Sequence, residues 1–130
     1  MIVLDASAAV ELVLRTPTGA RVAALASAPR ESLHAPHLLD IEVAQALRRY
    51  AAKRIISAAE GIQALDDLAS LDLVRYPHDV FLARIWQLRT NVTAYDACYL
   101  ALAETLAAPL LTCDSRIARA PGHGAIVEVV

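Results

Sequence analysis

The stretch Met1 to Ser7, MIVLDAS, sets the expected fold of this chain. Its apolar run ends in an acid followed by small residues, which predicts a buried central strand with Asp5 at its C-terminal tip and a helix capped by Ser7. A buried strand does not need that acid for its own stability. Because ligands bind at the C-terminal ends of strands in open parallel sheets, Asp5 is a candidate site residue.

Predicted strands and helices alternate along the rest of the chain. Further strands are expected at 32–35, 71–76, 109–112 and 125–130, and helices at 7–14, 20–26, 37–53, 58–68, 80–88 and 94–106. Strands joined through helices by short turns favour a parallel sheet that is covered on both faces. We therefore expect an α/β fold, a three-layer α/β/α sandwich with a central parallel sheet, in which residues 1–130 form a single domain.

The composition favours a compact protein with one core, since 57% of the 130 residues are hydrophobic and 20% are charged. No apolar run approaches the roughly 18 residues of a membrane span, and the N-terminus lacks the basic region and cleavage site of a signal peptide. We expect a cytoplasmic protein with no membrane partner. Cys98 and Cys113 lack a Cys or His at metal-binding spacing, so both are expected to be reduced core residues.

The formal net charge of -2 does not by itself indicate a nucleic-acid partner, because such binders are normally basic. A divalent cation on a cluster of acids, or cations gathered on one surface, would reconcile the charge with such a partner. On the helix expected at 37–53, Arg49 and Lys53 follow Glu42 along one face. They are candidates for binding phosphates, and a solvated helix face is the alternative explanation.

Three further acids are placed where they could join Asp5. Glu42 borders the apolar stripe of its helix, Asp96 begins the apolar face of the helix at 94–106, and Asp114 follows the strand at 109–112. Each has a structural alternative: a solvated side chain for Glu42, a capping box with Thr93 for Asp96, and a helix cap for Asp114. All four acids could meet at the C-terminal edge of the sheet.

Four carboxylates at one edge would repel one another and raise their pKa values unless a cation neutralised them. Oxygen-only ligands select hard ions such as Mg²⁺ or Mn²⁺ over zinc. Such a site suits phosphoryl chemistry, because the ion activates a water and offsets charge on the phosphate. Ser7 and Thr112 lie beside these acids as secondary polar candidates, which could bond to a ligand or, the favoured reading, to the backbone.

Four segments carry a family resemblance: IVLDAS around Asp5, DIEVAQAL around Glu42, TAYDACYLALAE around Asp96 and LLTCDSRIA around Asp114. They resemble the acidic motifs of PIN-domain ribonucleases, specifically the VapC toxins of bacterial toxin-antitoxin pairs, and the resemblance covers essentially the whole chain. It implies a Mg²⁺- or Mn²⁺-dependent endoribonuclease that hydrolyses phosphodiester bonds and leaves 5′-phosphate ends. It also implies a homodimer that a cognate VapB antitoxin silences.

The resemblance assigns roles to the four acids, which are all catalytic candidates. Asp5, Asp96 and Asp114 are the expected metal ligands, and Glu42 is a further ligand or a base that orients water. The two basic residues that follow Glu42 on its helix would help to hold RNA. The alternative is a catalytically silent PIN-like module that binds RNA or a protein partner, in which the acids only stabilise the fold.

Overall fold

The protein, seen in a computed structural model that describes residues 1–130, is built on one parallel β-sheet. Its strand order is β3-β2-β1-β4-β5, and every neighbouring pair is parallel. The strands are β1 (Ile2–Leu4), β2 (Leu33–Pro36), β3 (Leu73–Tyr76), β4 (Leu110–Thr112) and β5 (Val127–Val129). The expected parallel sheet with the first strand at its centre is confirmed.

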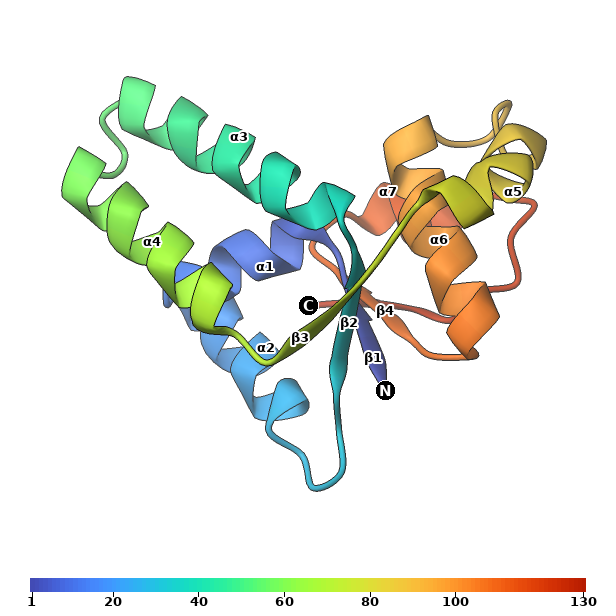
Figure 1. The fold of residues 1–130 in the computed structure, drawn as a ribbon, viewed down its shortest axis with the longest axis horizontal. Helices are drawn as coiled ribbons and strands as arrows, with labels where there is room; N and C mark the ends of the chain where they lie inside the picture. Colours follow the sequence, from blue (N-terminus) through green and yellow to red (C-terminus); the bar gives the residue numbers. More distant parts are fainter.

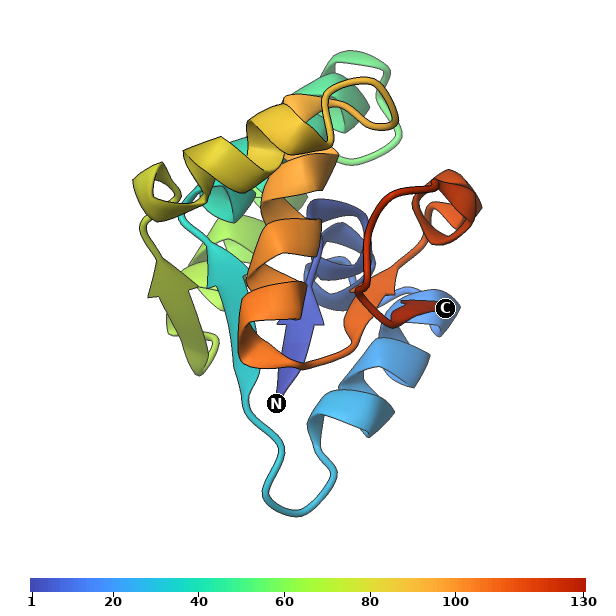
Figure 2. The same ribbon diagram turned by 90° about the vertical axis from the view of Figure 1, so that its right-hand side faces the viewer.

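Helices cover both faces of this sheet. They are α1 (Ala6–Val13), α2 (Pro17–Ala26), α3 (Leu38–Ala52), α4 (Ala58–Ser70), α5 (Leu82–Gln87), α6 (Ala94–Leu106) and α7 (Ser115–Arg119), with a 3₁₀ turn at Asp79–Phe81. Helices α1 to α4 lie on one side of the sheet, and α5 and α6 lie on the other (Figure 1). Figure 2 shows α6 lying directly over that second face. The three-layer α/β/α architecture is therefore confirmed.

Several helix boundaries follow from the capping residues in the sequence. Helix α6 begins where it was expected, because the Thr93 hydroxyl accepts a hydrogen bond from the Asp96 N–H at 3.1 Å. Helix α4 begins with a full capping box between Ser57 and Glu60. The helix expected at 80–88 is divided into the 3₁₀ turn and α5.

Two helices begin earlier than their sequence predicted. Asp5, not Ser7, caps α1: its carboxylate accepts from the Ala8 N–H at 2.9 Å, and Ser7 lies inside the helix. Helix α2 begins at Pro17 instead of residue 20, because Thr16 caps it and proline fits a first helical position, where no N–H donor is needed. The acid at the tip of β1 is therefore also the residue that starts α1.

The hydrophobic core is a single cluster of 29 buried residues around the central strands. Val3, Leu4 and Leu110 are completely buried, so β1 and β4 are covered on both faces, as parallel strands usually are. Cys98 belongs to this core, whereas Cys113 is only half-buried and packs against it, which corrects the expectation of two core cysteines. No helix combines the length and apolar character needed to cross a membrane.

The order of the strands determines where a site can form. The chain passes from β1 to β2 and β3 on one side, and then returns to place β4 on the other side of β1. This reversal is a topological switch point, and ligands of open α/β sheets bind outside the C-terminal ends of the strands there. Asp5 follows β1 at this point, and its N–H donates to the Leu111 carbonyl of β4 at 3.1 Å.

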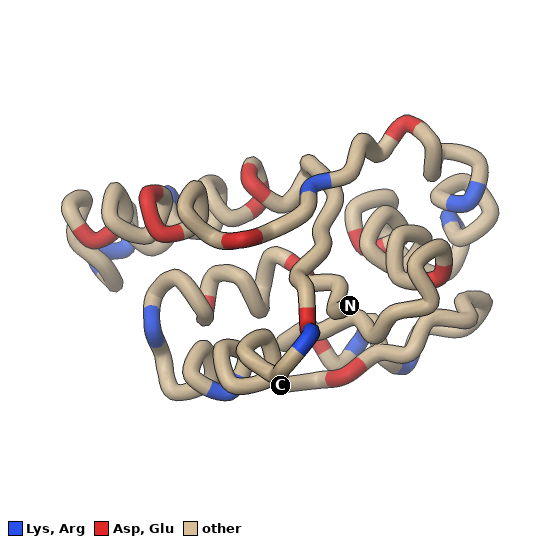
Figure 3. Tube along the Cα trace, turned by 60° about the horizontal axis from the view of Figure 1, so that its bottom comes forward, with Lys and Arg blue, Asp and Glu red and all other residues tan.

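Charged residues of both signs are spread over the helices, and neither sign occupies a large region alone (Figure 3). An attraction for a charged ligand must therefore come from local groups, not from the overall charge.

Candidate active site

Asp5 occupies the centre of the candidate site and is only 5% exposed. Its Oδ2 accepts from Thr112 Oγ1 at 2.5 Å, and its Oδ1 accepts from Ser7 Oγ at 2.7 Å and from the Ala8 N–H at 2.9 Å. Burial raises the pKa of Asp5, and these hydrogen bonds offset only part of that rise. A carboxylate offers about four lone-pair sites, so the side chain can still accept another partner.

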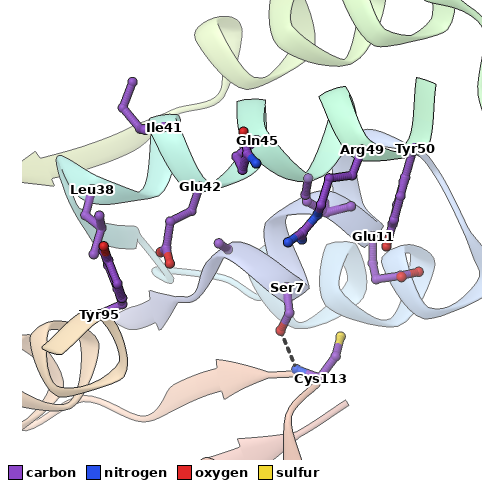
Figure 4. Close-up of a pocket in the computed structure, with 13 residues that line it drawn as sticks. Ser7, Glu11, Leu38, Ile41, Glu42, Gln45, Arg49, Tyr50, Tyr95 and Cys113 are labelled. Atoms are coloured by element: carbon purple, nitrogen blue, oxygen red, sulfur yellow. Dashed lines mark hydrogen bonds between the residues drawn. The ribbon is translucent and has the colours of Figure 1, made fainter. Parts of the chain in front are cut away.

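The two secondary polar residues connect the tip of β1 to the tip of β4. Thr112 Oγ1 accepts from the Asp114 N–H at 2.9 Å, and Ser7 Oγ accepts from the Cys113 N–H at 2.9 Å (Figure 4). Each hydroxyl thus bonds to the backbone and also donates to Asp5. The sequence analysis did not predict the bonds from these hydroxyls to Asp5. Together they fix the orientation of the Asp5 carboxylate.

Glu42 points from α3 toward the start of α1 (Figure 4). Its Oε2 accepts a 2.6 Å hydrogen bond from the hydroxyl of Tyr99, a residue only 2% exposed. Burial raises the pKa of Glu42, the Tyr99 bond lowers it, and the charges of Asp5 and Asp96 raise it further. Glu42 therefore lies within electrostatic reach of both aspartates.

Tyr99 is a site residue that the sequence analysis missed. Its signal was its spacing: it lies three residues after Asp96, one turn further along the same face of α6. An aromatic residue on an apolar helix face is usually interpreted as a core residue. Nothing in the sequence shows that the Tyr99 hydroxyl donates to Glu42 on another helix.

Asp96 is half-buried in the first turn of α6. Burial raises its pKa, a hydrogen bond with the Thr93 side chain lowers it, and the charges of Asp114 and Asp5 raise it. Thr93 caps the helix as expected, but the carboxylate does not make the return bond to the Thr93 N–H that would complete a capping box. The carboxylate is therefore engaged at the cap only through the Thr93 side chain.

Asp114 caps the short helix α7, as its structural alternative predicted. Its carboxylate accepts from the Arg116 N–H at 2.8 Å and pairs with the Arg116 guanidinium at 2.6 Å. The Arg116 bonds lower the pKa of Asp114, in contrast to the raised values at the other three acids. The sequence offered no signal for this pairing beyond the short spacing of the two residues.

The four acids gather at the C-terminal edge of the sheet. The charge of Asp5 acts on Glu42 and on Asp96, and Asp96 also experiences the charge of Asp114. Even so, no group of three or more His, Cys, Asp or Glu side chains is arranged to hold a metal ion. Three of the carboxylates are turned toward donors of the protein itself, namely Thr112, Tyr99 and Arg116.

The donor set nevertheless fits a hard divalent cation. It consists of carboxylate and hydroxyl oxygens, which Mg²⁺ and Mn²⁺ prefer, and contains no imidazole or thiolate ligand for zinc. Burial raises the pKa values of Asp5, Glu42 and Asp96, and neighbouring carboxylates raise those of Glu42 and Asp96 further. A cation would relieve that repulsion.

A groove of about 540 Å³ between α1 and α3 has Glu42, one of the four acids, in its lining. Figure 4 shows Glu42 and Arg49 pointing into it from α3, with Glu11 on the opposite wall. Apolar and aromatic side chains, including Leu38 and Tyr95, form much of its lining. Of the two basic candidates, Arg49 lines this groove and Lys53, which follows the last residue of α3, does not.

We expect Tyr99→Phe to lower the free energy of unfolding by about 1 kcal/mol at pH 7, because the half-buried Glu42 carboxylate loses its hydrogen-bond donor. The loss of that bond also raises the pKa of Glu42 further. The difference in unfolding free energy between the parent protein and Tyr99→Phe is therefore present at a pH above the raised pKa of Glu42, and it disappears as the pH falls and Glu42 becomes protonated. Urea unfolding at several pH values measures this. Tyr95→Phe on the same helix, where the ring is 60% exposed, is the control, and equal effects would contradict the prediction.

Asp96→Asn should have the opposite effect on the metal-free protein. The pKa of Asp96 is higher in the folded protein than in the unfolded chain. Such a group stabilises the fold at a pH below its unfolded pKa, and this contribution is lost as the pH rises through the folded pKa. At pH 7 the charged carboxylate is therefore less favourable in the fold than a neutral side chain. Removing this charge should raise the free energy of unfolding in a chelator by roughly 0.5 to 1 kcal/mol, since partial exposure screens the repulsion. Urea unfolding at pH 7, with exposed Asp66→Asn as control, tests this. A less stable Asp96 variant would show that the side chain is a structural cap.

Comparison with known proteins gives consistent results. The family model described as PIN domain matches residues 2–123. The chain is 47% identical over 130 residues to Ribonuclease VapC12 of Mycobacterium tuberculosis, covering 100% of this chain and 99% of the relative. Among solved structures, PAE2754 of Pyrobaculum aerophilum matches with a TM-score of 0.69 and 26% identity over 97% of this chain and 82% of that one.

A second structural neighbour, VapBC2 of Rickettsia felis bound to a DNA fragment from its promoter, has a TM-score of 0.70. The match covers 99% of this chain and 98% of that chain at 17% identity, so it supports the fold alone.

Proposed function

The chain belongs to the PIN-domain family and, within it, to the VapC ribonucleases, and on that premise we propose that it is a metal-dependent endoribonuclease acting as the toxin of a VapBC-type pair. The observation that supports this proposal best is the placement of Asp5, Glu42, Asp96 and Asp114 at the switch point of the sheet. Each acid comes from a different part of the chain. The charges of Asp5 and Asp96 raise the pKa of Glu42, and the charges of Asp114 and Asp5 raise the pKa of Asp96. A fold needs no such concentration of acids at one edge.

The proposed cofactor is Mg²⁺ or Mn²⁺, held by Asp5, Asp96 and Asp114, with Glu42 as a fourth ligand or as the base that orients water. The ion would supply an activated water and offset charge on the phosphate. The protein supplies orientation: Thr112 and Ser7 hold the Asp5 carboxylate, and Tyr99 holds Glu42. Hydrolysis with an activated water is proposed to leave a 5′-phosphate and a 3′-hydroxyl end.

A VapB-type antitoxin is the proposed partner, and the groove between α1 and α3 supports it. The groove combines an apolar lining with Glu11 and Glu42 and only one arginine, Arg49. An antitoxin segment that carries apolar and basic side chains would complement it, and a basic side chain there would neutralise Glu42. A homodimer, action in the cytoplasm and contact of Arg49 and Lys53 with RNA are further parts of the proposal.

The experiment that tests this function is a cleavage assay on a structured RNA with purified protein. We expect cleavage in Mg²⁺ or Mn²⁺, none in a chelator, and products whose new 5′ ends can be ligated directly because they carry phosphate. Addition of the antitoxin encoded beside the gene should stop cleavage.

The rival function is a catalytically silent PIN-like module that binds RNA or a protein. It predicts RNA binding without new ends in any metal, and that result would replace the proposed function. Cleavage that continues unchanged in the chelator would instead contradict the role of the metal.

A further inference from the structure

A second groove lies beside Asp96 and shares no lining residue with the groove between α1 and α3. It has a volume of about 510 Å³ and is lined by residues that connect α5 to α6 and by residues of α7. We call it the Arg89 groove; its lining includes Arg89, Asn91, Thr93, Asp96 and Arg116. Because Asp96 forms part of its wall, the groove begins at the candidate active site.

The two grooves differ in charge. The Arg89 groove carries two arginines against one carboxylate, whereas the groove between α1 and α3 carries one arginine against two glutamates. A polyanion would therefore favour the Arg89 groove, although the protein as a whole is slightly acidic.

Arg116 is available to a ligand despite its ion pair. Its side chain is 87% exposed, and ion pairs between solvent-exposed groups are weak. Its partner Asp114 is one of the four acids. Because the pair is this exposed, the guanidinium can turn to a phosphate next to the site without a bound cation.

Arg89 comes with an exposed aromatic ring. Its Cζ lies 4.7 Å from the ring centroid of Trp86, and its Nη1 donates to the Trp86 carbonyl at 2.8 Å. Trp86, the only tryptophan of the chain, is 68% exposed. Tryptophan side chains are on average largely buried, so this exposure is unusual. An arginine stacked on an exposed aromatic ring, at the edge of a basic groove, is the arrangement that binds single-stranded nucleic acid by base stacking and phosphate contacts.

We propose that the Arg89 groove is a subsite for single-stranded RNA, in which Arg89 and Arg116 contact phosphates and Trp86 stacks on a base. This inference rests on the proposed function and adds to it the path of the RNA on one side of the acids. It places the main RNA contacts on α5, on the turn that follows α5 and on α7, apart from Arg49 of α3 and Lys53 just after it.

The single tryptophan makes the proposal directly testable. The probe is a fluorescently labelled oligouridine of about 20 nucleotides, titrated in a chelator so that binding does not depend on metal or on cleavage. We expect Trp86 fluorescence to decrease over the same range of concentrations in which the anisotropy of the label rises. Arg89→Gln and Arg116→Gln should each weaken binding about fivefold and reduce the slope of log K against log salt by about 0.7, the value for one phosphate contact on a single strand.

Arg48→Gln is the matched control, since Arg48 is exposed on α3 outside both grooves and its side chain donates a hydrogen bond to Gln45 on the same helix. The inference is overturned if RNA does not bind at low salt, if it binds without changing Trp86 fluorescence, or if the groove variants match Arg48→Gln. A change in Trp86 fluorescence on dilution without RNA would assign this face to a second copy of the chain. In each of these cases metal-dependent cleavage by the parent protein would still support the proposed function.

Discussion

Asp5→Asn is expected to reduce RNA cleavage at least about a thousandfold while the protein remains folded. The substitution removes the charge at the centre of the four acids, and a metal that stabilises charge in the transition state contributes several kcal/mol, of which 1.4 kcal/mol corresponds to a factor of ten. Asparagine keeps the size of the side chain and an oxygen that accepts from the Ala8 N–H. Since burial already disfavours the charged form of Asp5, the neutral side chain should not destabilise the fold.

The measurement is the initial rate of cleavage at matched Mg²⁺ or Mn²⁺, beside thermal unfolding of the same samples. Asp66→Asn, which removes an exposed carboxylate from α4, controls for the loss of one negative charge. If Asp5→Asn cleaves as fast as the Asp66 variant, the site assignment is wrong.

Gly19→Ala is expected to lower the free energy of unfolding by about 1 to 3 kcal/mol or more, the cost of forcing an extra methyl group into a filled space. A Cβ at Gly19 would lie 2.0 Å from the carbonyl oxygen of Glu11 and 3.0 Å from the Leu12 Cα. Both atoms belong to the backbone of α1, so the clash cannot be relieved by turning a side chain. Helix α2 would have to move away from the helix that Asp5 caps.

Gly61→Ala provides the contrast within the same protein. A Cβ there would meet only the Ile56 Cδ1 at 3.8 Å, and Gly61 lies inside α4. Alanine at this position should stabilise the protein by roughly 0.5 to 1 kcal/mol, because it restricts the unfolded chain and favours helix. Urea unfolding compares the two variants, and a Gly19 variant as stable as the Gly61 variant would show that the two helices do not pack this closely.

Much of this fold follows from patterns that act over a few residues. The apolar run before Asp5 predicts the central strand, and the cap at Thr93 predicts the start of α6, because both depend on local hydrophobicity and hydrogen bonding. The early starts of α1 and α2 were missed because Asp5 and Thr16 are caps whose role depends on the backbone that follows them. The close approach at Gly19 involves two helices, and no single-helix pattern encodes it.

The site divides in the same way. The gathering of the four acids at one edge could be predicted because each ends a strand or borders a helix face, positions that the sequence shows. Tyr99 and Arg116 were missed because their importance depends on their partners. The Tyr99 hydroxyl donates to Glu42 and the Arg116 guanidinium donates to Asp114, and the sequence alone does not show these pairings. The metal remains part of the proposal, since the carboxylates are turned toward the protein's own donors and would have to reorient to share an ion.

The central claim is that a divalent cation held by these acids is responsible for RNA cleavage. The most direct measurement is a Mn²⁺ titration followed by electron paramagnetic resonance, with RNA cleavage assayed in the same samples of the parent protein, Asp5→Asn and Asp96→Asn. We predict saturable Mn²⁺ binding by the parent, cleavage that rises with occupancy, and loss of both in the two variants. Cleavage without bound Mn²⁺, or Mn²⁺ binding unchanged in both variants, would contradict the claim.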